Sequence, residues 1–149
     1  MEKAAFDTYI SRFNAEDPGA FEDYMAPDVR MLNGTLVLNG VAEVKGHYAR
    51  IWGAMRESLY VERFVSDADT VAIQMHTHFE VLTDDPASPF GEISVGETFD
   101  FHGLIMYRLR PHGKDAGEHA GKFADIKVAY NSFIYTNLDG EATDLGIPH

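Results

Sequence analysis

The chain has 149 residues, a formal net charge of −12 and no cysteine. Its length is that of one globular domain, and the absence of cysteine excludes disulfides, thiolate metal sites and cysteine nucleophiles. The acidic balance argues against nucleic acid and anionic membrane surfaces as partners. The apolar runs are shorter than the roughly 20 residues of a membrane helix, and no signal-like segment begins the chain, so we expect a cytoplasmic protein.

The first part of the chain shows helical and hairpin patterns. Apolar residues recur every three or four positions in 4–15, which predicts a helix, and Asp17 is placed to cap a short second helix. Residues 28–34 and 35–40 read as two short strands with Asn-Gly turns. Apolar spacing then predicts a longer helix over 41–57.

Alternation of apolar and polar residues dominates the rest of the chain, which predicts long strands. The four predicted strands are 59–67, 70–84, 97–110 and 122–136. Loops are predicted between the later strands, at 84–94 and 111–121. The tail, 137–149, is expected to be loose or packed on a partner. The order of elements predicts one α+β domain over 1–149, with the helices first and a curved antiparallel sheet second.

Three stretches together resemble the nuclear transport factor 2-like superfamily, in its SnoaL-like branch of polyketide-cyclase-like and ketosteroid-isomerase-like proteins: YISRFNAEDPGAFEDYMAPDV, NGVAEVKGHY and GKFADIKVAYN. The resemblance covers nearly the whole chain. It implies a conical α+β barrel, in which N-terminal helices pack on a strongly curved antiparallel sheet that encloses an apolar pocket. It also implies a homodimer and an enzyme that works without a cofactor.

The same resemblance gives candidate catalytic residues. Tyr9 falls where ketosteroid isomerases have an oxyanion-hole tyrosine, Tyr48 falls where a second tyrosine hydrogen-bonds the first, and His47 is the neighbouring position facing the pocket. The general-base aspartate of those isomerases aligns with Asn33, and their protonated aspartate aligns with Ile105, which argues against steroid isomerisation by that mechanism. Phenol, amide and imidazole groups at one cavity can polarise a substrate oxygen and move a proton, whereas in a core they merely find hydrogen-bond partners.

The last strand leaves an alternative open. Alternation turns Tyr130 and Ser132 inward and Lys127 and Asn131 outward, but strands of this family often bulge here, and a bulge would reverse the faces. Asn131 aligns with an acidic residue of the polyketide cyclases. A lysine in an apolar pocket would have a lowered pKa and act as a base, although a solvated lysine is the commoner case.

A His-x-His pair raises the question of a metal. His76 and His78 lie on one face of a strand, and Asp100 and His102 follow on the next strand. The alternating apolar residues of the strand place the histidines on the back of the sheet, at an interface or in solvent, unless a bulge turns them into the pocket. We therefore predict no metal and no cofactor.

The aromatic content, 12% of residues, favours a flat apolar ligand. The predicted substrate-binding side chains are Phe13, Trp52, Met75, Thr77, Phe79, Phe101, Tyr107 and Tyr130. The leading hypothesis is a cofactor-independent acid–base enzyme, a lyase, dehydratase, cyclase or isomerase, acting on a small apolar aromatic compound.

Relatives of this fold include lyases that release formaldehyde from lignin-derived diaryl compounds, and an aromatic pocket with phenol, imidazole and amide groups suits that chemistry. Tyr9, Tyr48 and Asn33 would hold the substrate oxygens, and His47, or alternatively Lys127, would relay protons. The alternative is a non-catalytic ligand-binding or dimerisation domain of the same fold.

Overall fold

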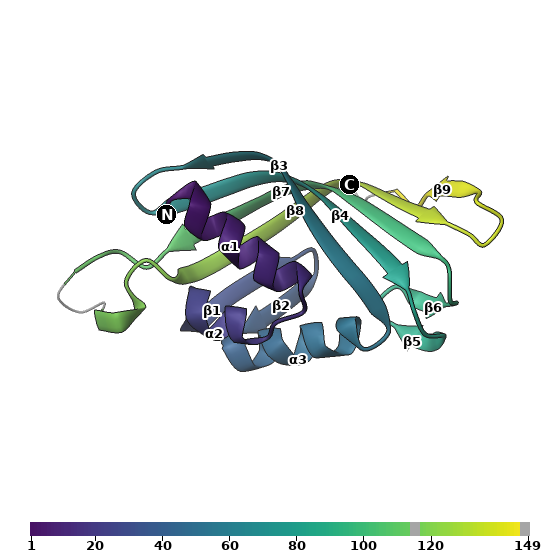
Figure 1. The fold of residues 1–149 in the computed structure, drawn as a ribbon, viewed down its shortest axis with the longest axis horizontal. Coiled ribbons are helices and arrows are strands. Elements are labelled where there is room, and N and C mark those ends of the chain that lie inside the picture. The colour runs from purple at the N-terminus through teal and green to yellow at the C-terminus, as the bar shows by residue number, and fades with distance from the viewer. Residues whose placement is uncertain (114–116, 147–149) are drawn as a thin grey trace.

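The computed structural model describes residues 1–113 and 117–146 (Figure 1). Within these two ranges there are three helices, a short 3-10 turn and nine strands. The helices are α1 (Lys3–Asn14), α2 (Gly19–Tyr24) and α3 (Val41–Trp52), and the turn is η1 (Gly117–His119). The strands are β1 (Met25–Asn33), β2 (Leu36–Asn39), β3 (Met55–Ser66), β4 (Thr70–Val81), β5 (Asp85–Ser88), β6 (Gly91–Ile93), β7 (Thr98–Leu109), β8 (Phe123–Thr136) and β9 (Ala142–Asp144).

One curved sheet forms the body of the fold, with strand order β2-β1-β8-β7-β4-β3 and β9 added to β8. All neighbours are antiparallel except β1 and β8, which run parallel. The helices lie over one face of this sheet, with α1 across it and α3 along one end (Figure 1). Among the described residues the outer strands β2 and β3 do not pair with each other, so the predicted α+β cone is confirmed but the sheet is not closed.

The sequence patterns and the structure differ in three places. The helix predicted over 41–57 ends at Trp52, and β3 begins at Met55. The predicted loop at 84–94 contains the small hairpin of β5 and β6. In the tail, β9 pairs with β8, so this part of the chain is a strand and not a loose end.

Side-chain hydrogen bonds fix the ends of the first two helices. The Asp17 carboxylate accepts a hydrogen bond of 2.9 Å from the Gly19 N–H, but the helix begins at Gly19 and Pro18 is its N-cap, so Asp17 lies one residue before the predicted cap position. The Asn14 amide donates to the Leu59 carbonyl oxygen at 2.9 Å and accepts from the Leu59 N–H at 2.8 Å. Asn14 therefore joins the end of α1 to β3, the strand that carries one wall of the site described below.

A bulge in β8 decides which of its side chains face the helices. Gly103 of β7 pairs with Tyr130, and His102 pairs with Ser132, so Asn131 is the extra residue. A Cβ atom on Gly103 would lie 2.2 Å from the carbonyl oxygen of Ala129, and this close approach requires glycine. Tyr130 points inward by alternation with Val128. Because of the bulge that follows it, Ser132 opposes outward-facing His102, and Phe133, the partner of Phe101, turns inward again.

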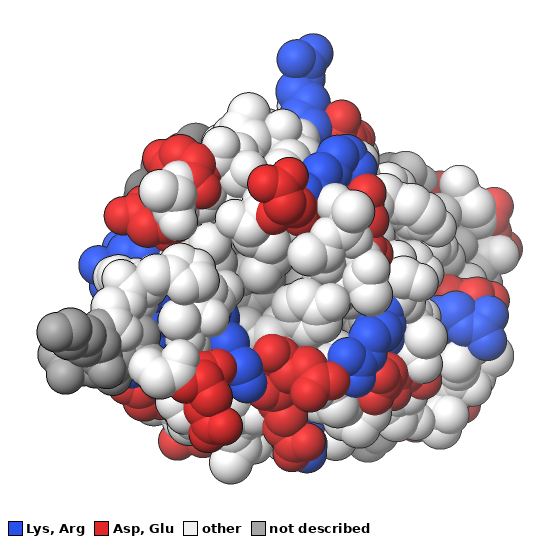
Figure 2. Space-filling model, turned by 60° about the vertical axis from the view of Figure 1, so that its left-hand side comes forward, with Lys and Arg blue, Asp and Glu red and all other residues white. Residues whose placement is uncertain are grey.

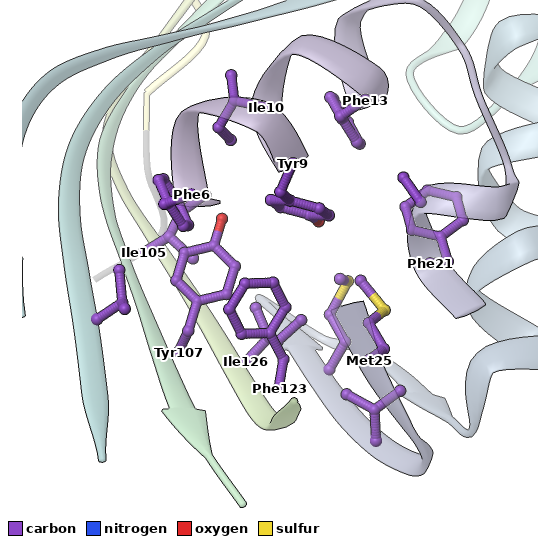
Figure 3. Close-up of a cluster of buried hydrophobic side chains, with 14 of the residues drawn as sticks. Phe6, Tyr9, Ile10, Phe13, Phe21, Met25, Ile105, Tyr107, Phe123 and Ile126 are labelled. Carbon is purple, nitrogen blue, oxygen red and sulfur yellow. The ribbon is translucent and has the colours of Figure 1, made fainter. Parts of the chain in front are cut away.

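Aromatic rings fill the core between α1 and the sheet (Figure 3). Tyr9 projects from α1 over Tyr107 of β7 and Phe123 of β8, with ring centroids 6.4 and 5.1 Å away. Phe6 lies beside the same rings, 5.3 Å from Tyr107. These residues are fully or almost fully buried, so this part of the fold is a packed core.

The surface carries mixed charge. Figure 2 shows one face on which basic side chains are interspersed with acidic ones around an uncharged, hollowed area. On this face the basic residues form no continuous patch of the kind that binds a phosphate backbone. None of the helices in the described part of the chain has the length and apolar character needed to cross a membrane.

Candidate functional site

A cavity of about 420 Å³ lies between α3 and the inner face of the sheet, next to the β5–β6 hairpin. Its size is within the usual range of small-molecule sites, about 300–1,000 Å³. Seven of the strands and α3 contribute to the wall. The lining residues are Asn33, Leu36, His47, Tyr48, Arg50, Ile51, Glu57, Leu59, Met75, Thr77, Phe79, Ser88, Pro89, Phe90, Phe101, Ile105, Val128 and Tyr130.

Glu57 places a carboxyl group in this mostly apolar wall. It lies near the start of β3 and is only 5% exposed. Burial raises its pKa to about 8, and the nearby Glu16 carboxylate acts in the same direction. The Trp52 indole N–H is near enough to oppose this rise in pKa, but it does not form a hydrogen bond with the carboxyl. Among the described residues, Glu57 Oε2 therefore has no hydrogen-bond partner. Glu57 therefore holds a proton at neutral pH, and its buried Oε2 is unsatisfied.

A phenol and an amide form a second polar group in the wall. The Tyr130 hydroxyl of β8 donates a hydrogen bond to the side-chain oxygen of Asn33 at the end of β1. Burial raises the pKa of Tyr130, and the charge of Glu57 raises it further. The hydrogen bond to Asn33 lowers it, but the net effect is a rise. The phenol therefore stays protonated, and its oxygen and the Asn33 amide nitrogen face a ligand from the strands opposite α3.

Helix α3 adds an imidazole and a second phenol. The rings of His47 and Tyr48 lie 5.2 Å apart, edge to face. Half-burial lowers the pKa of His47, and the neighbouring Arg50 guanidinium lowers it further, so the imidazole is neutral at pH 7 and can accept a proton. Burial raises the pKa of Tyr48 well above its ordinary value, and the charge of Glu57 is the second cause of the rise.

Aromatic rings form the end of the cavity beside the hairpin. Phe79, Phe90 and Phe101 meet at centroid distances of 5.0 to 5.5 Å. The Arg50 guanidinium donates a hydrogen bond to the Ala87 carbonyl oxygen, which links the end of α3 to β5. This end of the cavity offers ring faces and edges, which suit a flat aromatic ligand.

Eight of the side chains predicted for the site line the cavity together: Asn33, His47, Tyr48, Met75, Thr77, Phe79, Phe101 and Tyr130. Four others lie elsewhere. Tyr9, Phe13 and Tyr107 belong to the buried core, and Trp52 stacks on Phe21 of α2 at 5.6 Å and 13°. We assign these four side chains to packing, because none of them lines the cavity.

Lys127 and Asn131 lie outside the cavity. Lys127 is exposed on the outer face of β8, with Nζ 3.7 Å from Asp125. Asn131 is the exposed bulge residue. The bulge follows Tyr130, which is too late in the strand to turn Lys127 inward. It does reverse the side of Ser132, which was expected to face the cavity and instead faces away from it.

The histidine pair faces the back of the sheet, as the alternation predicts. Met75, Thr77 and Phe79 line the cavity, and His76 and His78 alternate with them on the opposite face of β4. Glu57 was missed by sequence reasoning, because the apolar spacing of α3 extends past the true end of the helix and gave this residue no place in a strand. The hairpin residues Ser88, Pro89 and Phe90 were missed because their composition is that of a loop.

The SnoaL-like domain family matches residues 6–116. The chain belongs to this family. Its structure is similar to that of a proposed polyketide cyclase from Xanthomonas campestris, with a TM-score of 0.69 and 21% identity over 87% of this chain and 89% of that one.

An epoxide hydrolase of Mycobacterium tuberculosis gives a TM-score of 0.64 at 11% identity, over 86% of this chain and 80% of that chain. A computationally designed binder of 17-OHP gives a TM-score of 0.63 at 18% identity, over 94% of this chain and 95% of that chain. No curated protein matches the chain significantly. At these identities the structural matches establish the fold, and the activities of those proteins are their own.

Proposed function

We propose that this SnoaL-like chain is a cofactor-independent acid–base enzyme acting on a small, apolar, aromatic compound. The observation that carries the proposal is Glu57, a protonated carboxyl in the wall of an aromatic cavity, with one oxygen that lacks a hydrogen-bond partner among the described residues. Enzymes raise the pKa of a carboxyl in this way to obtain a general acid that works near neutral pH. A neutral imidazole, His47, shares the cavity as a proton acceptor.

At the level of the reaction, we propose a lyase that releases formaldehyde from a lignin-derived diaryl propanediol with a phenolic ring. Glu57 donates its proton to the benzylic hydroxyl, the C–O bond breaks and water leaves. The phenol gives its proton to His47, and the ring becomes a quinone methide. Tyr130, Asn33 and Tyr48 orient the substrate oxygens.

The second half of the reaction restores both groups. The Glu57 carboxylate takes the proton of the primary alcohol, and the carbon–carbon bond to that carbon breaks. The electron pair of this bond flows into the quinone methide, so formaldehyde leaves and the ring becomes a phenolate. His47 returns its proton to the phenolate. The sum is one diaryl propanediol converted to one stilbene, one water and one formaldehyde, with no oxidant or reductant.

Turnover of a phenolic diaryl propanediol tests this proposal, with stilbene and formaldehyde measured by mass spectrometry. Glu57→Gln keeps the shape of the side chain but cannot donate a carboxyl proton, so we expect kcat to fall by about 10²–10⁴-fold. Glu80→Gln, an exposed carboxyl on the outer face of β4, is the matched control and should keep wild-type turnover. Equal turnover in Glu57→Gln and wild type would refute the role of Glu57.

The second candidate is a non-catalytic binding domain, favoured by the designed 17-OHP binder with the same fold. It predicts that aromatic ligands raise the melting temperature of wild type and Glu57→Gln without conversion by either.

The homodimer implied by the resemblance is also a proposal, supported by Leu104 and Met106, which are more than half exposed on the outer face of β7. A monomer in analytical ultracentrifugation would refute it. The cytoplasmic location stays a prediction from the sequence.

A further inference from the structure

Two imidazoles and a carboxylate converge on the outer face of the sheet, away from the cavity. His76 Nε2 lies 2.6 Å and His78 Nδ1 lies 2.8 Å from the same oxygen, Oδ1 of Asp100. The three ligand atoms all lie within 4.8 Å of one another. Strand pairing produces this arrangement, because Asp100 of β7 is the register partner of His78, and His76 is two residues earlier on the same face of β4.

Neighbouring rings hold His76 in place. On one side His102 of β7 stacks on it, with centroids 4.4 Å apart and an interplanar angle of 8°. On the other side Tyr60 of β3 stacks at 5.6 Å and 30°. The cluster therefore lies on two hydrogen-bonded strands, β4 and β7, with a supporting ring from β3, and side-chain positions on strands are better defined than in loops.

The cluster is open enough for an ion to enter and is set in negative surroundings. The side chains of His76, His78 and Asp100 are 28%, 36% and 23% exposed. The Glu62 carboxylate lies 4.0 Å from Nδ1 of His102, the ring that stacks on His76. With a net charge of −12 on the whole chain, the local and overall fields both attract a cation.

We propose that His76, His78 and Asp100 bind a zinc ion. Imidazole and carboxylate ligands suit zinc, whereas calcium and magnesium prefer oxygen ligands alone. Three protein ligands leave the fourth tetrahedral position to water or to a group from another molecule. This proposal does not rest on the proposed function, because the cluster and the cavity lie on opposite faces of the sheet.

The geometry requires only a small adjustment. Bonds of about 2.0–2.1 Å in a tetrahedral site place neighbouring ligand atoms about 3.3 Å apart. The two N–O distances of 2.6 and 2.8 Å must therefore widen by about 0.5–0.7 Å, and the two imidazole nitrogens, which lie within 4.8 Å of each other, must also settle at about 3.3 Å. Rotation of the half-exposed His78 ring and of the carboxylate provides this movement without a change in the strands. Zinc coordination then replaces the two imidazole–Asp100 hydrogen bonds.

Equilibrium dialysis of chelator-treated protein against zinc, with metal measured by mass spectrometry, tests the proposal. We expect one zinc per chain in wild type, and the same in His112→Ala, which removes an exposed histidine of the loop after β7. His78→Ala and Asp100→Asn each remove a ligand and should weaken binding by about 100-fold or more, since loss of supporting groups alone costs about 10–100-fold. Circular dichroism confirms that the variants are folded.

Two outcomes would overturn the zinc site: wild type that takes up no zinc, or ligand variants that bind it as tightly as wild type. The spectrum of bound Co²⁺, compared between wild type and His78→Ala, is a second readout, because imidazole coordination changes its visible absorption. Glu57→Gln should bind zinc as wild type does. Turnover of Glu57→Gln tests only the acid–base proposal, and zinc binding by the ligand variants tests only the zinc site. The two proposals can therefore fail independently.

Discussion

The buried Glu57 carboxyl should make the stability of the fold depend on pH, and Glu57→Gln should remove that dependence. The pKa of this group is about 8 in the folded chain against an ordinary value of 4.5. The folded state therefore binds the proton more tightly than the unfolded chain. For a carboxyl with a raised pKa, stability is highest at low pH and falls as the pH rises from the unfolded value to the folded value.

The size of the effect follows from proton linkage. Each unit of pKa difference corresponds to about 1.36 kcal/mol, so ionising the buried group costs about 5 kcal/mol in full. Between about pH 5 and about pH 9, the window accessible to measurement, the contribution of this one group to the free energy of unfolding falls by about 4 kcal/mol. Above the folded pKa the penalty is constant, because both states are ionised.

Urea denaturation of wild type and Glu57→Gln at both pH values measures this difference. Other titrating groups affect both proteins, so the loss of stability in wild type should exceed that in Glu57→Gln by about 4 kcal/mol. The control Glu80→Gln should lose as much stability as wild type. If Glu57→Gln and wild type lose equal stability with rising pH, Glu57 ionises normally in the fold and cannot be the acid proposed for catalysis.

Three further substitutions test particular positions. Gly103→Ala should destabilise the fold by about 1–3 kcal/mol or more, because its methyl group meets the β8 backbone. Gly46→Ala, on the exposed side of α3, should instead stabilise the fold by about 1 kcal/mol. Thermal unfolding measures both changes, and the reverse order of stabilities would refute the bulge. Arg50→Gln removes a positive charge beside half-buried His47, so the His47 pKa should rise in an NMR titration, and an unchanged pKa would mean that burial alone lowers it. Tyr9→Phe should keep turnover within about twofold, since the ring lies in the core; a loss of about 10²-fold would restore the role predicted for its hydroxyl.

Alternation along β4 was enough to predict which side chains reach the cavity. Met75, Thr77 and Phe79 follow the period of two, and β4 pairs with β7 without a register shift, so parity holds along the strand. The same rule fails at the end of β8, because the bulge at Asn131 depends on a contact between two strands. Only the glycine at position 103, in an otherwise bulky strand, marked the place where that contact occurs.

Glu57 shows a different limit of sequence reasoning. The apolar period of α3 continues beyond its end, and only Gly53 marks the boundary where the chain turns into β3. A carboxyl in that region reads as a solvated helix residue, because ionised side chains are seldom buried. Its burial depends on the inward face of β3 and on neighbours that include Tyr9 of α1 and Tyr130 of β8, which are distant in the sequence. The residue most important for the proposed chemistry was therefore the one with the weakest local signal.

The parallel pairing of β1 with β8 has a consequence for how the chain folds during synthesis. The hydrogen bond between Asn33 and Tyr130 joins residues 97 positions apart, and β8 lies between β1 and β7 in the sheet. Until β8 leaves the ribosome, β1 and β7 each keep an unpaired edge, and the cavity lacks a wall. Contacts of such long range make folding slow. The nascent chain therefore exposes strand edges that can aggregate, and it gains a site only when its last long strand is made.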